Sequence, residues 1–112
     1  LESEIEAVEP FPPTHNHPWC TAQVRAAATE SGLEVHELDA PFRWSEDFGH
    51  LAHRFPAALI GLGAGVEQPQ LHHPDYDFPD LLIEPGVCLF QALVARLLDA
   101  EPAPEVPCSK PR

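Results

Sequence analysis

Basic residues are scarce in this chain. Six Lys and Arg stand against 18 Asp and Glu in 112 residues, so the formal net charge is −12. Nucleic-acid phosphates are negatively charged, and such a chain repels them. The six basic residues are also scattered along the sequence, so they form no basic patch. The composition therefore excludes nucleic acid as a partner.

Cysteines and long apolar runs are also few. Cys20, Cys88 and Cys108 form no CxxC motif and no even set of bridges, which favours reduced thiols in a cytoplasmic protein. No uninterrupted apolar run approaches the roughly 20 residues of a membrane span. No signal-peptide pattern opens the chain. We therefore expect no membrane partner, and the start at Leu1 instead of Met indicates a piece cut from a longer protein.

Helix signals occur in three places. A helix is predicted over residues 18–31, with Asn16 as its N-cap and Gly32 as its stop. A second begins at Ser45 and ends before Pro56. Its predicted buried face is Phe48, Leu51, Ala52 and Phe55. The third runs from Glu84 and Pro85 to about Asp99, with an apolar stripe of Phe90, Leu93, Val94, Leu97 and Leu98.

Strand signals alternate with these helices. The pattern predicts an edge strand over residues 1–8, a short strand over 35–38, and a strand buried on both faces over 57–62. Strand and helix then follow one another throughout. The predicted fold is therefore α/β, a fragment of a three-layer-type sandwich with β-α alternation. The charged, proline-rich residues 100–112 are predicted to be a disordered tail.

The loop after the last apolar segment carries the first chemical candidate. His72 and His73 follow a run of alternating glycines and precede Pro74, with Asp75 and Asp77 just downstream. Acidic neighbours suit a cation better than an anion, so one of the two histidines is a candidate metal ligand. The alternative is that both are ordinary loop residues.

Three other groups are weaker candidates. Glu46 and Asp47 at a helix start could orient metal ligands, or could only complement the helix dipole. The remaining histidines form an i, i+3 pair and a small cluster with a cysteine. His50 and His53 form the pair, for which the alternative is a solvated helix face. His15 and His17 form the cluster with Cys20, for which the alternative is a structural turn.

The order of these motifs is similar to a known family. Phe-Pro-Pro-Thr-His-Asn from Phe11, Ser-Glu-Asp-Phe from Ser45 and Leu-His-His-Pro-Asp-Tyr-Asp-Phe from Leu71 succeed one another, with the apolar segment from Phe55 to Gly63 before the last. This succession resembles the C-terminal part of the zinc-dependent amidohydrolases and peptidases that include aminoacylases, hippurate hydrolases and carboxypeptidases. The resemblance spans roughly Val8 to Leu98.

The resemblance implies a domain plan and a chemistry. Residues 1–9 would be the last strand of a lid domain through which the parent dimerises, and 10–99 the C-terminal part of the catalytic domain. Such enzymes hydrolyse N-acyl amino acids or peptide amide bonds with water bound to divalent metal, which we expect to be zinc. His72 matches the last metal ligand, His73 is the less favoured choice, and Glu46 and Asp47 take supporting roles.

The same resemblance leaves the chain incomplete. The other metal ligands and the catalytic glutamate lie upstream in such enzymes, so no catalytic residue is assigned here and the isolated chain is expected to be inactive. Arg43 and Trp44 stand where small residues are usual, which affects the pocket shape. The alternative function is a non-enzymatic α/β interaction module or a degenerate remnant. A small metal-binding protein using His15, His17 and Cys20 is a third possibility.

Overall fold

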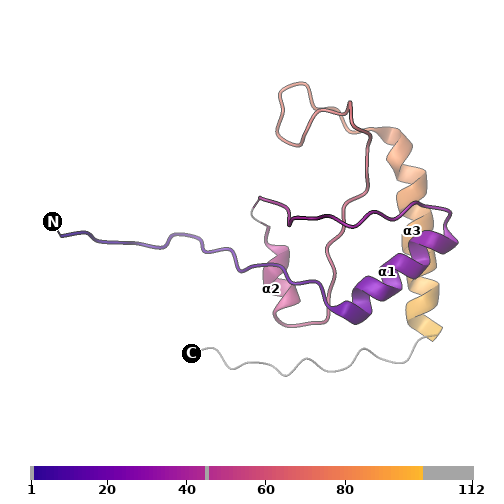
Figure 1. The fold of residues 1–112 in the computed structure, drawn as a ribbon, viewed down its shortest axis with the longest axis horizontal. Helices are drawn as coiled ribbons and strands as arrows, with labels where there is room; N and C mark the ends of the chain where they lie inside the picture. Colours follow the sequence, from indigo (N-terminus) through magenta and orange to yellow (C-terminus); the bar gives the residue numbers. More distant parts are fainter. Residues whose placement is uncertain (1, 45, 100–112) are drawn as a thin grey trace.

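The fold is built from helices joined by long extended segments. The computed structural model describes residues 2–44 and 46–99. In chain order they contain α1 (Pro18–Glu30), α2 (Phe48–Ala52), the short 3₁₀ helix η1 (Asp80–Leu82) and α3 (Ile83–Asp99). Helices α1 and α3 pack against each other, and the N-terminal segment extends away from them (Figure 1). The predicted tail over 100–112 lies outside the described residues.

Helix α1 begins and ends close to the predicted residues. Pro18 occupies the first turn, where its missing N–H has no helical partner to lose. At the other end Gly32 adopts φ 74°, and the Leu33 N–H donates to the Ala28 carbonyl at 2.9 Å. These features confirm the predicted stop. The predicted N-cap is wrong, because His17 holds that position without a side-chain bond and Asn16 is used elsewhere.

Helix α2 is shorter than predicted and buries a different face. It covers only Phe48–Ala52, with Asp47 as N-cap, while Ser45 lies outside the described residues. The predicted apolar face is wrong at Leu51 and Phe55, which are exposed, whereas Phe48 and Ala52 are half-buried. The buried residue is instead Gly49. A Cβ added there would lie 2.2 Å from the Pro12 carbonyl oxygen, so the helix meets the N-terminal connector backbone directly.

The predicted α/β sandwich is wrong for the part of the chain that the structure describes. Residues 2–44 and 46–99 contain no strand. Segments 35–38 and 57–62 lie outside any helix, but a strand also needs a ladder of backbone hydrogen bonds to a neighbour. No described segment supplies that ladder. Ile60 and Leu62 are also exposed, so residues 57–62 are not buried on both faces as predicted.

A pair of hydrogen bonds from the Asn16 side chain, which we call the Asn16 clip, joins residues 57–62 to the chain instead of such a ladder. The Asn16 Nδ2 donates to the Leu59 carbonyl at 2.9 Å, and the Leu59 N–H donates to Asn16 Oδ1 at 2.8 Å. Beside it, the His17 N–H donates to the Ala57 carbonyl at 2.8 Å. An asparagine amide can direct one of its two N–H donors and its carbonyl oxygen toward the same peptide unit, much as a neighbouring strand would. It therefore joins segments 43 residues apart.

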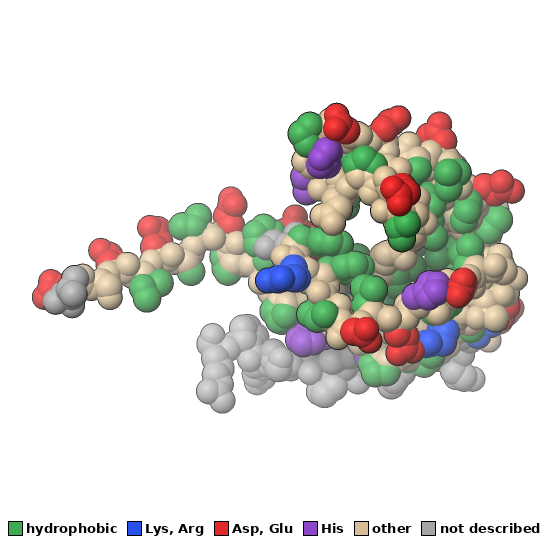
Figure 2. Space-filling view, turned by 45° about the horizontal axis from the view of Figure 1, so that its top comes forward, with side chains coloured by type: hydrophobic (Ala, Val, Ile, Leu, Met, Phe, Trp, Pro, Cys, Tyr) green, Lys and Arg blue, Asp and Glu red, His purple; other side chains and the backbone are tan. Residues whose placement is uncertain are grey.

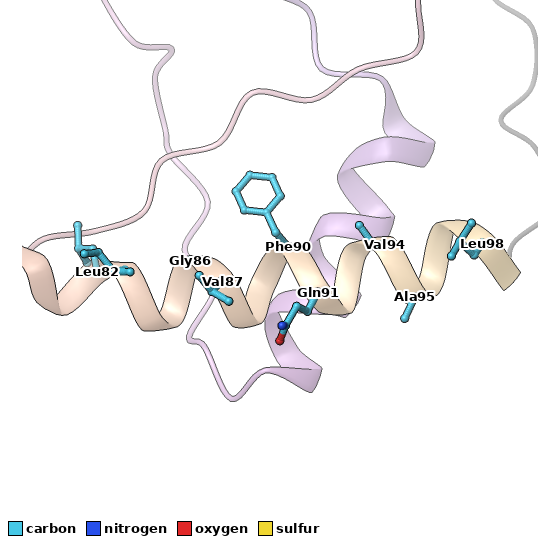
Figure 3. A pocket seen from close by; sticks show the side chains of 9 residues that line it. Leu82, Gly86, Val87, Phe90, Gln91, Val94, Ala95 and Leu98 are labelled. Carbon is cyan, nitrogen blue, oxygen red and sulfur yellow. The ribbon is translucent and has the colours of Figure 1, made fainter.

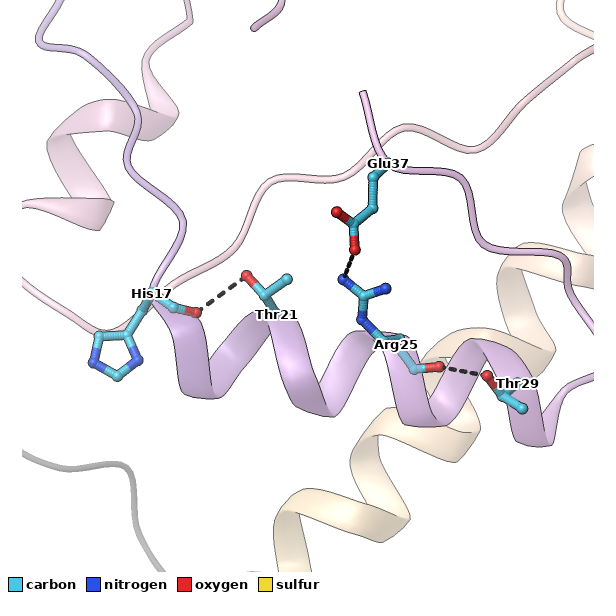
Figure 4. A network of polar contacts seen from close by, with 5 residues as sticks. All are labelled: His17, Thr21, Arg25, Thr29 and Glu37. Atoms are coloured by element: carbon cyan, nitrogen blue, oxygen red, sulfur yellow. Dashed lines mark hydrogen bonds and ion pairs between the residues drawn. The ribbon is translucent and has the colours of Figure 1, made fainter. Parts of the chain in front are cut away.

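The core lies between α1 and α3 and is small. Its buried residues are Ala27, Ala28 and Leu89, with Leu33, Ala92 and Leu93 packed against them. Arg96 of α3 donates to Gln23 and Glu30 of α1, which adds a polar clasp at one end. A second ion pair joins Arg25 of α1 to Glu37 in the segment after it (Figure 4). Because two of the three buried residues are alanines, the core of the described residues removes few large side chains from water.

The predicted apolar stripe of α3 meets the core between α1 and α3 only at Leu93. Leu93 is half-buried on the core side, whereas Phe90, Val94, Leu97 and Leu98 are exposed. The stretch Asp80–Asp99 is long and apolar enough to cross a membrane by length and composition, although no uninterrupted apolar run was found in the sequence. It contains Glu84 and Arg96, and very little of it is buried within the chain.

Candidate functional site

The candidate site is the projecting loop between the apolar segment 57–62 and η1. It forms the upper part of the molecule in Figure 1, and Figure 2 shows histidine and acidic side chains near each other there. Two backbone hydrogen bonds close successive turns within it. The His73 N–H donates to the Gln70 carbonyl at 3.0 Å, and the Tyr76 N–H donates to the His73 carbonyl at 2.9 Å. The loop thus presents His72 and His73 on consecutive tight turns.

His72 has a backbone conformation that is uncommon for residues other than glycine. Its φ is 70°, in the left-handed region. It is the third residue of the turn closed by Gln70 and His73, a position where type II turns require positive φ and favour glycine. A residue with a Cβ held in such a region costs of order 1–3 kcal/mol, and such residues cluster at functional sites. No feature of the sequence indicated this strain.

His73 differs from His72 in its hydrogen bonding. Its Nδ1 accepts the Asp75 N–H at 3.2 Å and lies 3.8 Å from the Asp75 carboxylate. This local turn occupies one ring nitrogen. Among the described residues, the His72 side chain takes part in no hydrogen bond or ion pair, and it is exposed. The geometry of the loop therefore separates the two histidines that spacing alone left equivalent.

Glu46 and Asp47 are exposed residues at the start of α2. The Asp47 carbonyl accepts the His50 N–H at 3.0 Å, but its carboxylate forms no capping hydrogen bond. Local capping therefore does not use either carboxylate directly. Nor does the structure bring them to His72: the described residues contain no group of three or more His, Cys, Asp and Glu able to hold a metal.

The other histidine candidates are not assembled either. His50 and His53 are exposed on and after α2, and they belong to no metal-binding group in the described ranges. His15 is exposed, and the His17 ring lies beyond the start of α1, as Figure 4 shows. The His17 Nδ1 atom is buried and makes no hydrogen bond. Burial raises the pKa of the Cys20 thiol, which disfavours the thiolate that binds metal.

Comparison with known proteins decides the family. The model of peptidase family M20/M25/M40 matches residues 2–96, most of the chain. The chain belongs to this family. The matched range includes the projecting loop, the start of α2 and nearly all of α3. It therefore confirms the peptidase-family part of the resemblance found in the sequence, and it supports a hydrolase.

Two curated relatives are also hydrolases by name. An uncharacterized hydrolase of Staphylococcus aureus strain N315 is 31% identical over 68 residues, covering 60% of this chain and 18% of its own. An uncharacterized hydrolase of Staphylococcus epidermidis strain RP62A is 34% identical over 64 residues, covering 56% of this chain and 17% of its own. The matches thus span less than a fifth of each relative. No solved structure matches the chain.

Family membership raises the question of a metal, since the M20 family generally uses divalent ions. A catalytic zinc site needs about three protein ligands and an open position. The described residues bring no such group together. They therefore do not fit a complete metal site, and no catalytic step is assigned to a metal held by this chain alone.

Proposed function

We propose that this chain is the C-terminal segment of a metal-dependent amidohydrolase, to which it contributes one metal ligand, His72. The parent hydrolyses N-acyl amino acids or peptide amide bonds. The observation that carries the proposal is the strained His72 backbone within a loop of the family-matched range. A positive φ costs conformational free energy for histidine but not for glycine, so a functional need for the imidazole side chain explains why histidine stands at this position.

The loop geometry also favours His72 over His73. A metal ligand must offer a nitrogen lone pair, and local hydrogen bonding engages His73 Nδ1. The His72 ring is exposed and has no such engagement with a described residue. Glu46 and Asp47, whose carboxylates form no capping bond, take a supporting role in orienting groups near the completed site.

The remaining parts of the proposal concern the parent protein. Residues 1–9 belong to a lid through which two parents dimerise, and residues 10–99 close the catalytic domain. The native metal is zinc and the protein acts in the cytoplasm, as the sparse cysteines suggest. Aminoacylase and hippurate hydrolase chemistry is the specific activity proposed.

A chimera tests this function. The 68-residue matching segment of the S. aureus hydrolase is replaced by the corresponding part of this chain. Bound zinc and the hydrolysis of hippurate, other N-acyl amino acids and dipeptides are then measured. We expect His72→Ala to abolish activity and reduce bound zinc, and His73→Ala to reduce activity by less than tenfold. The reverse order would assign the ligand to His73.

A glycine substitution separates strain from function. His72→Gly removes the ring and relieves the positive φ, so the chimera should lose activity while its melting temperature stays equal or rises. His72→Ala removes the same ring but keeps the strain, which makes it the matched control. Retained activity in His72→Gly would refute the ligand assignment.

The isolated chain provides the complementary test. Because its described residues form no metal-binding group, it should neither hold stoichiometric zinc in calorimetry nor hydrolyse hippurate. Hydrolysis by the purified chain with added zinc would contradict the proposed incompleteness.

A second candidate is a non-enzymatic interaction module, favoured by the exposed apolar residues of α3. An inactive but well-folded chimera would support that function instead.

A further inference from the structure

Two aromatic side chains stack on each other in the segment that leads to α2. The ring centroids of Phe42 and Trp44 lie 4.3 Å apart, and the ring planes differ by 17°. This is the one stacked pair of rings within residues 2–44 and 46–99. Phe90, by contrast, projects from α3 (Figure 3) and belongs to no such pair. We call Phe42 and Trp44 the aromatic pair.

The aromatic pair is held on one side and open on the other. A Cβ added to Gly61 would lie 3.2 Å from the Cζ atom of Phe42, so the Phe42 ring lies against the Gly61 backbone. The same ring stacks on Trp44. Trp44 nevertheless remains 53% exposed. Phe42 thus fixes the indole ring in place, while about half of the Trp44 surface faces solvent.

The aromatic pair connects the two segments that carry the candidate site. Trp44 lies two residues before Glu46, so their Cα atoms are at most about 7 Å apart. Gly61 begins the glycine run that leads into the projecting loop. In Figure 1 the chain before α2 crosses the segment that rises to this loop, and the Phe42–Gly61 contact joins the two. A group bound to the pair would therefore lie beside a carboxylate that the proposed function places near the completed site.

A fixed and exposed indole ring suits a planar aromatic group. Aromatic rings in offset-stacked or edge-to-face contact gain free energy beyond the burial of their apolar area. A short aliphatic group, such as acetyl, has no ring and does not gain this contribution.

We propose that the aromatic pair binds the ring of an aromatic acyl group, so that Trp44 makes the completed enzyme prefer aromatic N-acyl amino acids to short aliphatic ones. Trp44 is then a residue that determines specificity by touching the substrate. This rests on the proposed function, in which the chain completes an amidohydrolase site.

Saturation-transfer NMR on the 112-residue chain tests the aromatic pair directly. Hippurate carries a benzoyl group on glycine and N-acetylglycine carries an acetyl group, so the two ligands differ only in the acyl group. We expect hippurate to bind at least about fivefold more tightly than N-acetylglycine. Trp44→Leu should reduce this preference below twofold. Trp44→Phe, which keeps an aromatic ring, should retain most of it.

Matched variants test whether the effect is specific to the pair. Phe55→Leu removes another exposed aromatic ring and should leave the preference for hippurate unchanged within twofold. Gly61→Ala should lower the preference at least twofold, because the added Cβ displaces the Phe42 ring. Gly63→Ala should not lower it, because the space around Gly63 is open. Circular dichroism verifies that each variant keeps its helices.

Three outcomes would overturn the proposal. The first is that the chain binds hippurate no more tightly than N-acetylglycine. The second is a preference that Trp44→Leu leaves unchanged. The third is self-association of the chain that Trp44→Leu abolishes, because it would assign the exposed pair to a second copy.

Kinetics in a chimera distinguish this proposal from the proposed function. The chimera carries residues 2–96 of this chain in place of the corresponding part of the S. aureus hydrolase. If both proposals hold, Trp44→Leu should lower kcat/KM at least about fivefold for hippurate and less than twofold for N-acetylglycine. Hydrolysis of both substrates with equal effects of Trp44→Leu would retain the function and reject the aromatic subsite. Selective hippurate binding without any hydrolysis would retain the subsite and reject the function.

Discussion

The Asn16 clip gives the sharpest structural prediction. Its amide forms two hydrogen bonds with the Leu59 backbone, at 2.9 and 2.8 Å. Each neutral hydrogen bond contributes about 0.5–1.5 kcal/mol net, so Asn16→Ala should destabilise the junction by about 1–3 kcal/mol. The site is exposed, and water can replace both bonds, which favours the lower half of that range. The effect should be local, because the clip lies outside the α1–α3 core.

Amide hydrogen exchange of His17 is the appropriate assay. The His17 N–H donates to Ala57 at 2.8 Å and does not bond Asn16 itself, so it reports whether the junction opens. With about 1.4 kcal/mol per tenfold, a loss in the lower half of that range accelerates exchange by about 5-fold to about 30-fold. Asn16→Asp keeps the acceptor but turns the donor into a second oxygen facing the Leu59 carbonyl. It should therefore accelerate exchange by at least the lower limit.

A matched control tests whether the effect is specific. The Gln68 side chain also donates to a backbone carbonyl, that of Asp77 at 2.7 Å, in a different loop. Gln68→Ala should leave His17 exchange unchanged within twofold. Unchanged exchange in Asn16→Ala, or equal acceleration in Gln68→Ala, would refute the assignment of the clip to this junction.

Three further predictions concern packing and thiol chemistry. Gly49→Ala should separate α2 from the N-terminal connector, although alanine has the better helix propensity, because the added Cβ would meet the Pro12 carbonyl oxygen. Tryptophan fluorescence and the rate of proteolysis should both change. Gly63→Ala is the control and should change neither, because the space around Gly63 is open. Leu89→Ala should cost about 2–5 kcal/mol and greatly reduce the 222 nm helical signal at 25 °C, because so little else is buried; an unchanged thermal melt would contradict the assigned core. Iodoacetamide at pH 8 should modify exposed Cys88 several-fold faster than half-buried Cys20, because burial raises the pKa of the Cys20 thiol. Peptide mapping measures the two rates, and equal rates would contradict this difference in environment.

Local sequence signals predicted α1 and α3 well, but they predicted the length of α2 and the surroundings of all three helices poorly. Pro18 and Gly32 bracket α1 because proline and glycine act through their own backbone geometry. The capping role predicted for Asn16 failed because its amide found a partner 43 residues away. Nothing local distinguishes an amide that caps a helix from one that binds a distant peptide.

The predicted strands failed for a related reason. Apolar character over residues 57–62 indicates an extended segment, but a strand exists only when a neighbouring segment completes its hydrogen bonds. The described residues provide the Asn16 amide and the His17 N–H at this place, and no ladder. In the same way, the apolar stripe of α3 was visible in the sequence, while its exposure depended on where α1 packs.

For the candidate site, the order of motifs was sufficient to indicate the M20 family and to single out His72 and His73. That information is local because the loop's residue types and their sequence order carry it. The resemblance already favoured His72 over His73, and the positive φ of His72 and the hydrogen bond that engages His73 are consistent with that choice. The sequence by itself thus determined the family, the helices and the candidate loop. Only the tertiary structure decided that the apolar segments do not pair as strands in the described residues, which face of α3 is exposed and that His72 has a positive φ, because each depends on contacts or backbone angles that no local pattern specifies.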